Sequence, residues 1–176
     1  MRRVNEYVKK ARTLGFSRAR IIDPVSVAVA EWVRWKCQFG CDGYGACLTC
    51  PPYSPSPETT RKVLADYSRA LLLQTLDADL NRDPGFPAGQ RKLVAALERE
   101  MFLDGHYKAF GMAAGPCGVC RSCDPAKGCR KPSLARPSME ACGIDVYRTA
   151  RNNGLRLEVV RSGESLCAFV CLILID

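Results

Sequence analysis

The sequence has little of what enzymes commonly use for acid–base or nucleotide chemistry. It contains one histidine, His106, so any mechanism or metal site that needs two histidines is excluded, Rieske-type ligation included. It has neither a GxGxxG fingerprint nor a Walker phosphate loop. The chemistry of the chain must therefore come from other residue types.

Long apolar runs are also missing. The longest, residues 166–175, is too short to cross a bilayer. The first residues lack the apolar core of a signal peptide, and Val4, Tyr7, Val8 and Ala11 recur instead at helical spacing. A chain that is not exported keeps its thiols reduced. We therefore expect a cytoplasmic protein without a membrane span.

Acidic residues are fewer than basic ones. The chain has 18 Asp and Glu against 26 Lys and Arg, a net charge of +8, and an apolar fraction of 47% that includes eleven cysteines. These totals exclude a disordered, an acidic or a membrane-spanning protein. With 176 residues, the chain is expected to form a single metal-binding domain, residues 1–176.

The hydrophobic pattern predicts alternating helices and strands. Helices are expected over residues 4–14, from Ser56, over 93–105 and over 138–153, and strands over 19–22, 70–76, 107–113, 155–160 and 166–175. This order predicts an α/β or α+β fold with a small mixed sheet flanked by helices and cysteine-rich loops at strand ends. Residues 19–76 and 107–175 repeat the order strand, cysteine loop, helix, strand, which indicates a structural pseudo-repeat.

The more diagnostic of the two cysteine loops is the second. Its spacing is C-x2-C-x2-C-x5-C, formed by Cys117, Cys120, Cys123 and Cys129. Thiolates at successive i, i+3 steps can reach different irons of a cubane, as in the bacterial ferredoxin run, whereas structural zinc sites use two separated C-x2-C pairs. The spacing therefore favours a [4Fe-4S] cluster, with zinc, or an apo or disulfide role, as the alternatives.

The first cysteine loop holds four thiols within fourteen residues, at Cys37, Cys41, Cys47 and Cys50. Glycines between them allow tight turns that bring backbone N–H groups toward cluster sulfides. This loop also predicts a [4Fe-4S] site. Zinc binding and a glycine-rich turn with free thiols remain the alternatives.

The other candidate residues have simpler interpretations. Cys142, Cys167 and Cys171 fall on predicted helix or strand positions and are expected in the core. The basic residues near the second loop are expected to offset cluster charge, or else to attract a small anionic substrate or an acidic redox partner; they are Arg121, Lys127, Arg130, Lys131 and Arg136. The loop lacks the interleaved aromatics and the motif of a nucleic-acid binder, so no nucleic-acid partner is expected.

Both cysteine loops resemble the signatures of a known family. The stretch KCQFGCDGYGACLTCPPYSPSPE resembles the first signature, and AFGMAAGPCGVCRSCDPAKGCRKPSLARPSMEACGIDVYRTARNNG the second, of the predicted metal-binding proteins called domain of unknown function 2284. The resemblance implies metal binding of an iron–sulfur kind, without a reaction. It also implies that Cys37, Cys41 and Cys50 carry the first signature, and that Cys47 is not a usual member.

These patterns lead to one function and two alternatives. The chain is expected to bind one or two [4Fe-4S] clusters and to transfer electrons with a redox partner protein. The first alternative is an iron–sulfur enzyme in which three cysteines leave one iron open for a small substrate. The second is a structural zinc-binding interaction module.

Overall fold

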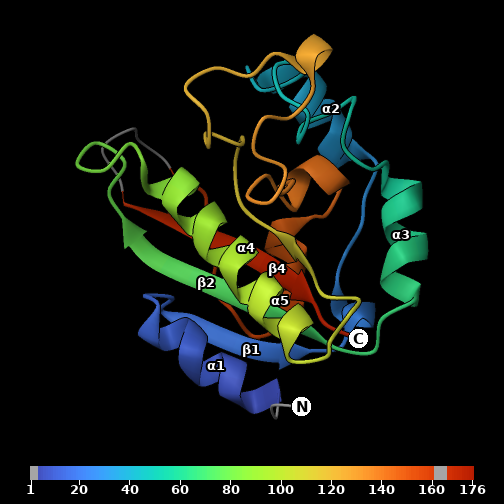
Figure 1. Cartoon of the computed structure of the whole chain (residues 1–176), viewed down its shortest axis with the longest axis vertical. Coiled ribbons are helices and arrows are strands. Elements are labelled where there is room, and N and C mark those ends of the chain that lie inside the picture. Colours follow the sequence, from blue (N-terminus) through green and yellow to red (C-terminus); the bar gives the residue numbers. More distant parts are fainter. Residues whose placement is uncertain (1–3, 161–165) are drawn as a thin grey trace.

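A four-stranded antiparallel sheet forms the centre of the molecule (Figure 1). The computed structural model describes residues 4–160 and 166–176. The strands are β1 (Arg18–Ile22), β2 (Ala70–Ala78), β3 (Phe110–Met112) and β4 (Cys167–Leu174), in the order β1-β2-β4-β3. This confirms the α+β class, and the sheet expected to be mixed is antiparallel in each of its three pairings. Ile22 at the end of β1 pairs with Ala70 at the start of β2, so their long connection returns the chain to the same end of the sheet.

Helices cover both faces of the sheet. Residues of α1 (Val4–Thr13) and α4 (Phe86–Leu103) pack with Leu71 and Leu73 on one face. Residues of α3 (Pro57–Ala65) and α5 (Val146–Asn152) pack with Leu72 on the other. Because successive side chains of a strand point to opposite faces, a strand covered on both sides is expected to be apolar at successive positions, as residues 70–73 of β2 are.

The order of elements is similar in the two halves of the chain. Each half runs helix, strand, cysteine-containing connection, helix and strand, and the sheet order is symmetric about the β2–β4 pair. This arrangement is compatible with the pseudo-repeat of residues 19–76 and 107–175. The repeat itself stays a prediction.

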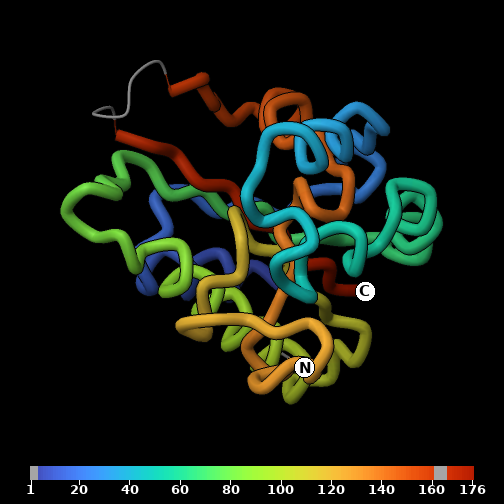
Figure 2. Tube along the Cα trace, turned by 90° about the horizontal axis from the view of Figure 1, so that it is seen from above, coloured from blue at the N-terminus to red at the C-terminus, as the bar shows by residue number. Residues whose placement is uncertain are grey.

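The two cysteine loops lie side by side at one end of the molecule (Figures 1 and 2). The connection after β1 contains η1 (Pro24–Ser26), α2 (Trp32–Gly40) and then the first loop. The connection after β3 contains the second loop, with η2 (Pro125–Lys127), and then η3 (Glu140–Cys142). Helix α2 was not predicted, and it places Cys37 on a helix. No helix in the described ranges is both long enough and apolar enough to span a membrane.

Backbone hydrogen bonds tie the cysteine loops to the fold. Ala113 N–H donates to Pro137 O (2.8 Å) and Met139 N–H donates to Ala113 O (3.0 Å), which closes the second loop at its base. The first connection joins the second through the bridge between Val29 and Ile144. The two loops are therefore held by one shared set of backbone contacts.

Two predicted elements differ from the structure. The helix expected from Ser138 is a single 3-10 turn, in which Ser138 Oγ accepts from Ala141 N–H (3.0 Å) and which ends at Gly143 with φ +78°. Helix α5 begins later, where Asp145 accepts from Arg148 N–H (2.9 Å). Residues 155–160 are not a strand, and Gln74 Nε2 donates to the Arg156 carbonyl oxygen (2.8 Å) there.

Candidate metal centre

Three of the four cysteines of the first loop line one cavity. Cys37 lies in the last turn of α2, Cys41 directly follows the helix, and Cys50 lies at the far end of the turn. Together they line a cavity of about 520 Å³, called here the first cavity. Gly43 lies between two of the thiols, because a Cβ on it would be 3.4 Å from both Cys41 Sγ and Cys50 Sγ. Its N–H donates to Cys41 Sγ (3.4 Å), as expected for a backbone amide that supports a thiolate.

Cys47 is placed differently from its three neighbours. Its thiol lies 3.2 Å from Cys50 Sγ, but its side chain lines another cavity of about 370 Å³, the second cavity. The contact with the Cys50 thiol, and after it hydrogen bonds with Cys117 N–H and Thr49, hold the pKa of Cys47 below its usual value although burial opposes this. The same contact with Cys47, together with burial, raises the pKa of Cys50.

The second loop brings its four predicted ligands to the second cavity. They share its wall with Cys47, and they are Cys117, Cys120, Cys123 and Cys129. Gly118 and Gly128 have φ of +60° and +77°, which lets the chain reverse between the thiols. Cys117 and Cys120 are half-buried, whereas Cys123 and Cys129 are exposed. The loop therefore presents one side of its cysteine set to solvent.

The two cavities are adjacent. Gly43 and Pro116 belong to the walls of both. The structure thus brings all eight predicted cysteines into two neighbouring sets, three in the first cavity and five around the second. Within the part of the chain that the structure describes, no three side chains of His, Cys, Asp or Glu are grouped closely enough to hold a single metal ion. The assignment of individual ligands stays a prediction.

A buried arginine lies beneath the second loop. Arg91 of α4 is 0% exposed, and its guanidinium donates to five carbonyl oxygens at 2.6–3.2 Å, those of Ala114, Gly115, Pro116, Cys117 and Arg136. It therefore holds both ends of the loop. No ion pair of the described residues involves Arg91. Burial lowers the pKa of its guanidinium, and nearby cysteines oppose this, Cys117 foremost, then Cys171, Cys50 and Cys47.

Glu140 belongs to the wall of the first cavity, and its carboxyl group is buried. Its Oε2 is sealed from solvent and has no hydrogen-bond partner among the described residues. Burial raises the pKa of this carboxyl group, while hydrogen bonds from its own backbone N–H and from Ser138, and the charge of Arg91, act in the opposite direction. Cys37 Sγ lies 4.0 Å from the Glu140 carbonyl oxygen, so η3 is close to the thiols of the first loop.

The remaining cysteines lie away from the two cysteine-lined cavities. Cys142 and Cys171 are in the core, as predicted, and burial raises the pKa of each thiol to about 12, which leaves them protonated and inert. Cys167, also expected in the core, is half-buried instead.

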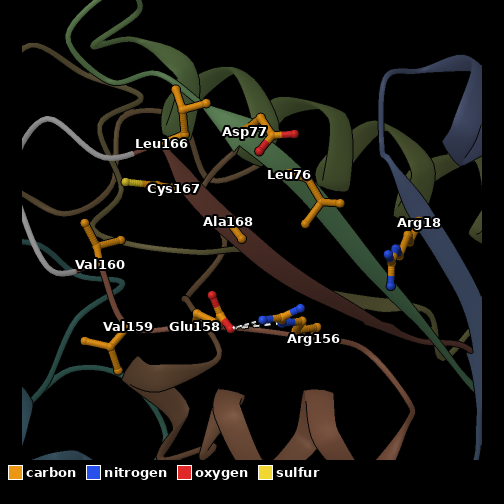
Figure 3. Close-up of a pocket in the computed structure, with 10 residues that line it drawn as sticks. All are labelled: Arg18, Leu76, Asp77, Arg156, Glu158, Val159, Val160, Leu166, Cys167 and Ala168. Atoms are coloured by element: carbon orange, nitrogen blue, oxygen red, sulfur yellow. Dashed lines mark hydrogen bonds and ion pairs between the residues drawn. The ribbon is translucent and has the colours of Figure 1, made fainter.

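A cavity larger than either cysteine-lined cavity lies elsewhere. It measures about 780 Å³ and contains one cysteine, Cys167, beside the exposed Arg156–Glu158 ion pair (Figure 3).

The single histidine, His106, is buried, and its Nδ1 lies 3.0 Å from Asp176 Oδ2.

Sequence reasoning missed Arg91 and Glu140. Helical periodicity carries a signal for the arginine, because Arg91 lies three and four residues before the buried Val94 and Ala95. A charged residue on the apolar stripe of a helix is uncommon. No local pattern distinguishes Glu140 from an exposed first-turn glutamate.

Comparison with known proteins gives one match. The model of the family described as "Predicted metal-binding protein (DUF2284)" matches residues 20–175, which include both cysteine loops. No curated protein matches the chain, and no solved structure matches it.

Proposed function

Because this chain belongs to the DUF2284 family of predicted metal-binding proteins, we propose that it binds two iron–sulfur clusters side by side and transfers single electrons. Cys117, Cys120, Cys123 and Cys129 would hold one [4Fe-4S] cluster in the second cavity. The thiols of the first cavity would hold the other. When bound, such clusters supply one-electron oxidation and reduction.

The observation that carries this proposal is the buried charge of Arg91, which forms no direct ion pair among the described residues. A buried charge is normally paired, because removing an ion from water costs several kcal/mol that hydrogen bonds alone do not recover. Five carbonyl groups satisfy the donors of Arg91 but bring no negative charge. A cubane held by four thiolates carries a charge of about −2 in its oxidised state. The buried Glu140 carboxyl group interacts with the charge of Arg91 from a distance, and an anionic centre between the loops would supply the closer partner that five carbonyl groups do not.

The ligand set supports iron–sulfur clusters over zinc. The tight C-x2-C-x2-C triplet suits the corners of a cubane, whereas a tetrahedral zinc site is usually built from two separate pairs. The Gly43 N–H that donates to Cys41 Sγ is the kind of contact that raises a cluster potential. A site held by the same thiols with zinc would have no redox function.

Exposure suggests the direction of electron flow. Of the thiols of the second loop, Cys123 and Cys129 are exposed, whereas of the first-cavity thiols Cys41 is exposed, Cys37 half-buried and Cys50 buried, so the second cluster would be the one that exchanges electrons with a partner. Basic side chains around the exposed loop would attract a partner with an acidic surface; they include Arg121, Lys127, Arg130 and Lys131.

The test is metal and sulfide analysis of protein purified without oxygen. We expect about eight iron and eight acid-labile sulfide per chain, for two four-iron clusters, and low-temperature EPR signals after reduction. Zinc in place of iron, or iron without sulfide, would overturn the proposal. Four iron per chain would limit it to one cluster, and alanine substitution of Cys41 or Cys120 would then identify the occupied site.

A further inference from the structure

The backbone holds Cys47 and Cys50 in the form that a disulfide needs. Their sulfur atoms lie 3.2 Å apart, and Cys50 N–H donates to the Cys47 carbonyl oxygen (2.9 Å). Such a four-residue turn keeps its two end Cα atoms within about 7 Å of each other, and disulfides join Cα atoms that are roughly 4–7 Å apart. An S–S bond is about 2.05 Å long, so the two sulfur atoms need to approach by only about 1 Å.

The same pair does not have the geometry of two ligands on one metal ion. Two thiolates bound at about 2.3 Å to a tetrahedral zinc ion lie roughly 3.8 Å apart, which is wider than the contact between Cys47 and Cys50. The two side chains also line different cavities. The contact is therefore better explained by chemistry between the two thiols than by a shared ion.

Small molecules can reach the pair from two sides. Cys47 and Cys50 are each only 7% exposed, but Cys50 lines the first cavity and Cys47 the second. The wall of each cavity includes an exposed cysteine, Cys41 in the first and Cys123 in the second, so both cavities extend to solvent. Their volumes of about 520 and 370 Å³ admit a molecule as small as hydrogen peroxide, whereas a protein oxidant could not contact thiols so deeply covered.

We infer that Cys47 and Cys50 form a site of reversible oxidation, at which a small peroxide joins the two thiols as a disulfide. The first thiol to react breaks the O–O bond, takes one oxygen atom as a sulfenic acid and releases water. The second thiol attacks that sulfur, the S–O bond breaks, the S–S bond forms and a second water leaves. Two thiols and one hydrogen peroxide thus give one disulfide and two waters. The inference uses the thiol positions alone, so it holds whichever metal the chain binds.

The disulfide has two consequences for Cys50. It would leave Cys37 and Cys41 as the free thiols of the first cavity, so it would exclude a metal from that cavity; this consequence alone rests on the proposed function. It would also protect Cys50, because a thiol without a neighbouring thiol is oxidised further to sulfinic and sulfonic acids, which dithiothreitol does not reduce. Cys47 is therefore assigned as the thiol that keeps the oxidation of Cys50 reversible.

The test locates the bond in the full-length protein, purified without oxygen and treated with increasing hydrogen peroxide. Free thiols are alkylated, and mass spectrometry with fragmentation of the tryptic peptide 37–61, which contains all four cysteines of the first loop, identifies the pairing. We expect the Cys47–Cys50 bond to exceed any other pairing of Cys50 by about tenfold or more, because its thiols are already in contact, and dithiothreitol to reverse it. Pairing of Cys50 with Cys37 or Cys41, or oxidation without any bond, would overturn the inference.

The variant Cys47→Ser tests the protection of Cys50, with Cys167→Ser as its control, since Cys167 is a half-buried thiol outside both cysteine-lined cavities. Each protein receives the peroxide dose that closes the bond in the unmodified protein, and then dithiothreitol. The unmodified protein and Cys167→Ser should recover Cys50 as a free thiol, whereas Cys47→Ser should lose it to sulfinic or sulfonic acid. Equal recovery in all three would overturn the inference. Iron and sulfide contents, which test the proposed function, play no part in this readout, so either proposal can fail without the other.

Discussion

The thiols of Cys47 and Cys50 lie 3.2 Å apart, yet the two side chains line different cavities. Gly43 and Pro116, which both cavities share, mark the boundary between them. The close contact places Cys47 where it can influence the first site without belonging to its wall. The four-cysteine set expected from the first loop is thus divided three to one by the structure.

This division predicts opposite outcomes for two alanine variants. Cys47→Ala should keep both clusters, because the three thiols of the first cavity and the four of the second loop remain. Cys50→Ala should lose the first cluster and about half of the iron. Iron and sulfide analysis with EPR of the anaerobic proteins measures both. Loss of the first cluster in Cys47→Ala would instead favour a closed four-cysteine site.

The role assigned to Arg91 predicts a change in potential that depends on charge. Arg91→Gln removes a buried positive charge, so the midpoint potential should become more negative, since reduction adds an electron to an already anionic centre. Arg91→Lys keeps the charge but loses most of the fork of hydrogen bonds, and its potential should stay closer to that of the unmodified protein. Both variants should lower the free energy of unfolding, Arg91→Gln by about 3 kcal/mol or more.

Arg136 provides the matched control for Arg91. It also lies at the second loop, but its guanidinium forms an ion pair with Glu98 at 2.6 Å, which already neutralises its charge. The double variant Glu98→Gln/Arg136→Gln removes both charges of the pair and leaves the net charge unchanged, so it should leave the potential nearly unchanged. An equal shift in this double variant and in Arg91→Gln, measured by redox titration, would contradict a special role for the buried charge.

Much of the fold could be predicted because its signals are local. The sequence Ser-Pro-Glu predicts a capped helix, and Ser56 Oγ indeed accepts from Thr59 N–H (3.1 Å) at the start of α3. The similar Ser-Met-Glu at Ser138 does not start a long helix, because Gly143 turns left-handed after one turn. A local cap signal marks where a helix can begin and does not determine its length.

The candidate site could be predicted only in part, for a physical reason. Spacing along the chain identifies the eight cysteines, but the division of Cys47 from Cys50 depends on how two distant loops pack against each other. Arg91 acts through carbonyl groups that are 23 to 45 residues away. Contacts across such separations depend on the fold, which residue spacing does not describe.

Gly143 predicts a stability effect at the turn that follows η3. Its φ is +78°, and a Cβ would lie 2.5 Å from Pro57 Cγ and 3.2 Å from Pro57 Cα. Gly143→Ala therefore combines the left-handed backbone cost of about 1–2 kcal/mol with a clash against a rigid ring, and should lower the free energy of unfolding by about 3 kcal/mol. Gly154→Ala is the control, since φ is +65° and its nearest neighbour is the flexible end of Arg20. Urea denaturation that shows equal losses would contradict the clash.

Asp176 predicts a stability change with pH. Hydrogen bonds from Arg69 lower the pKa of its carboxyl group in the folded state, and a hydrogen bond with the neighbouring His106 lowers it further. A lowered folded pKa means that the stabilisation is complete above the ordinary pKa of about 3.9 and is lost as the pH falls through the folded value. Asp176→Asn should thus be less stable than the unmodified protein near neutral pH, by up to about 1 kcal/mol for so exposed a pair. The difference should vanish in acid. Urea denaturation of both proteins at a series of pH values measures it, and a difference that stays constant below pH 4 would contradict the assigned ion pair.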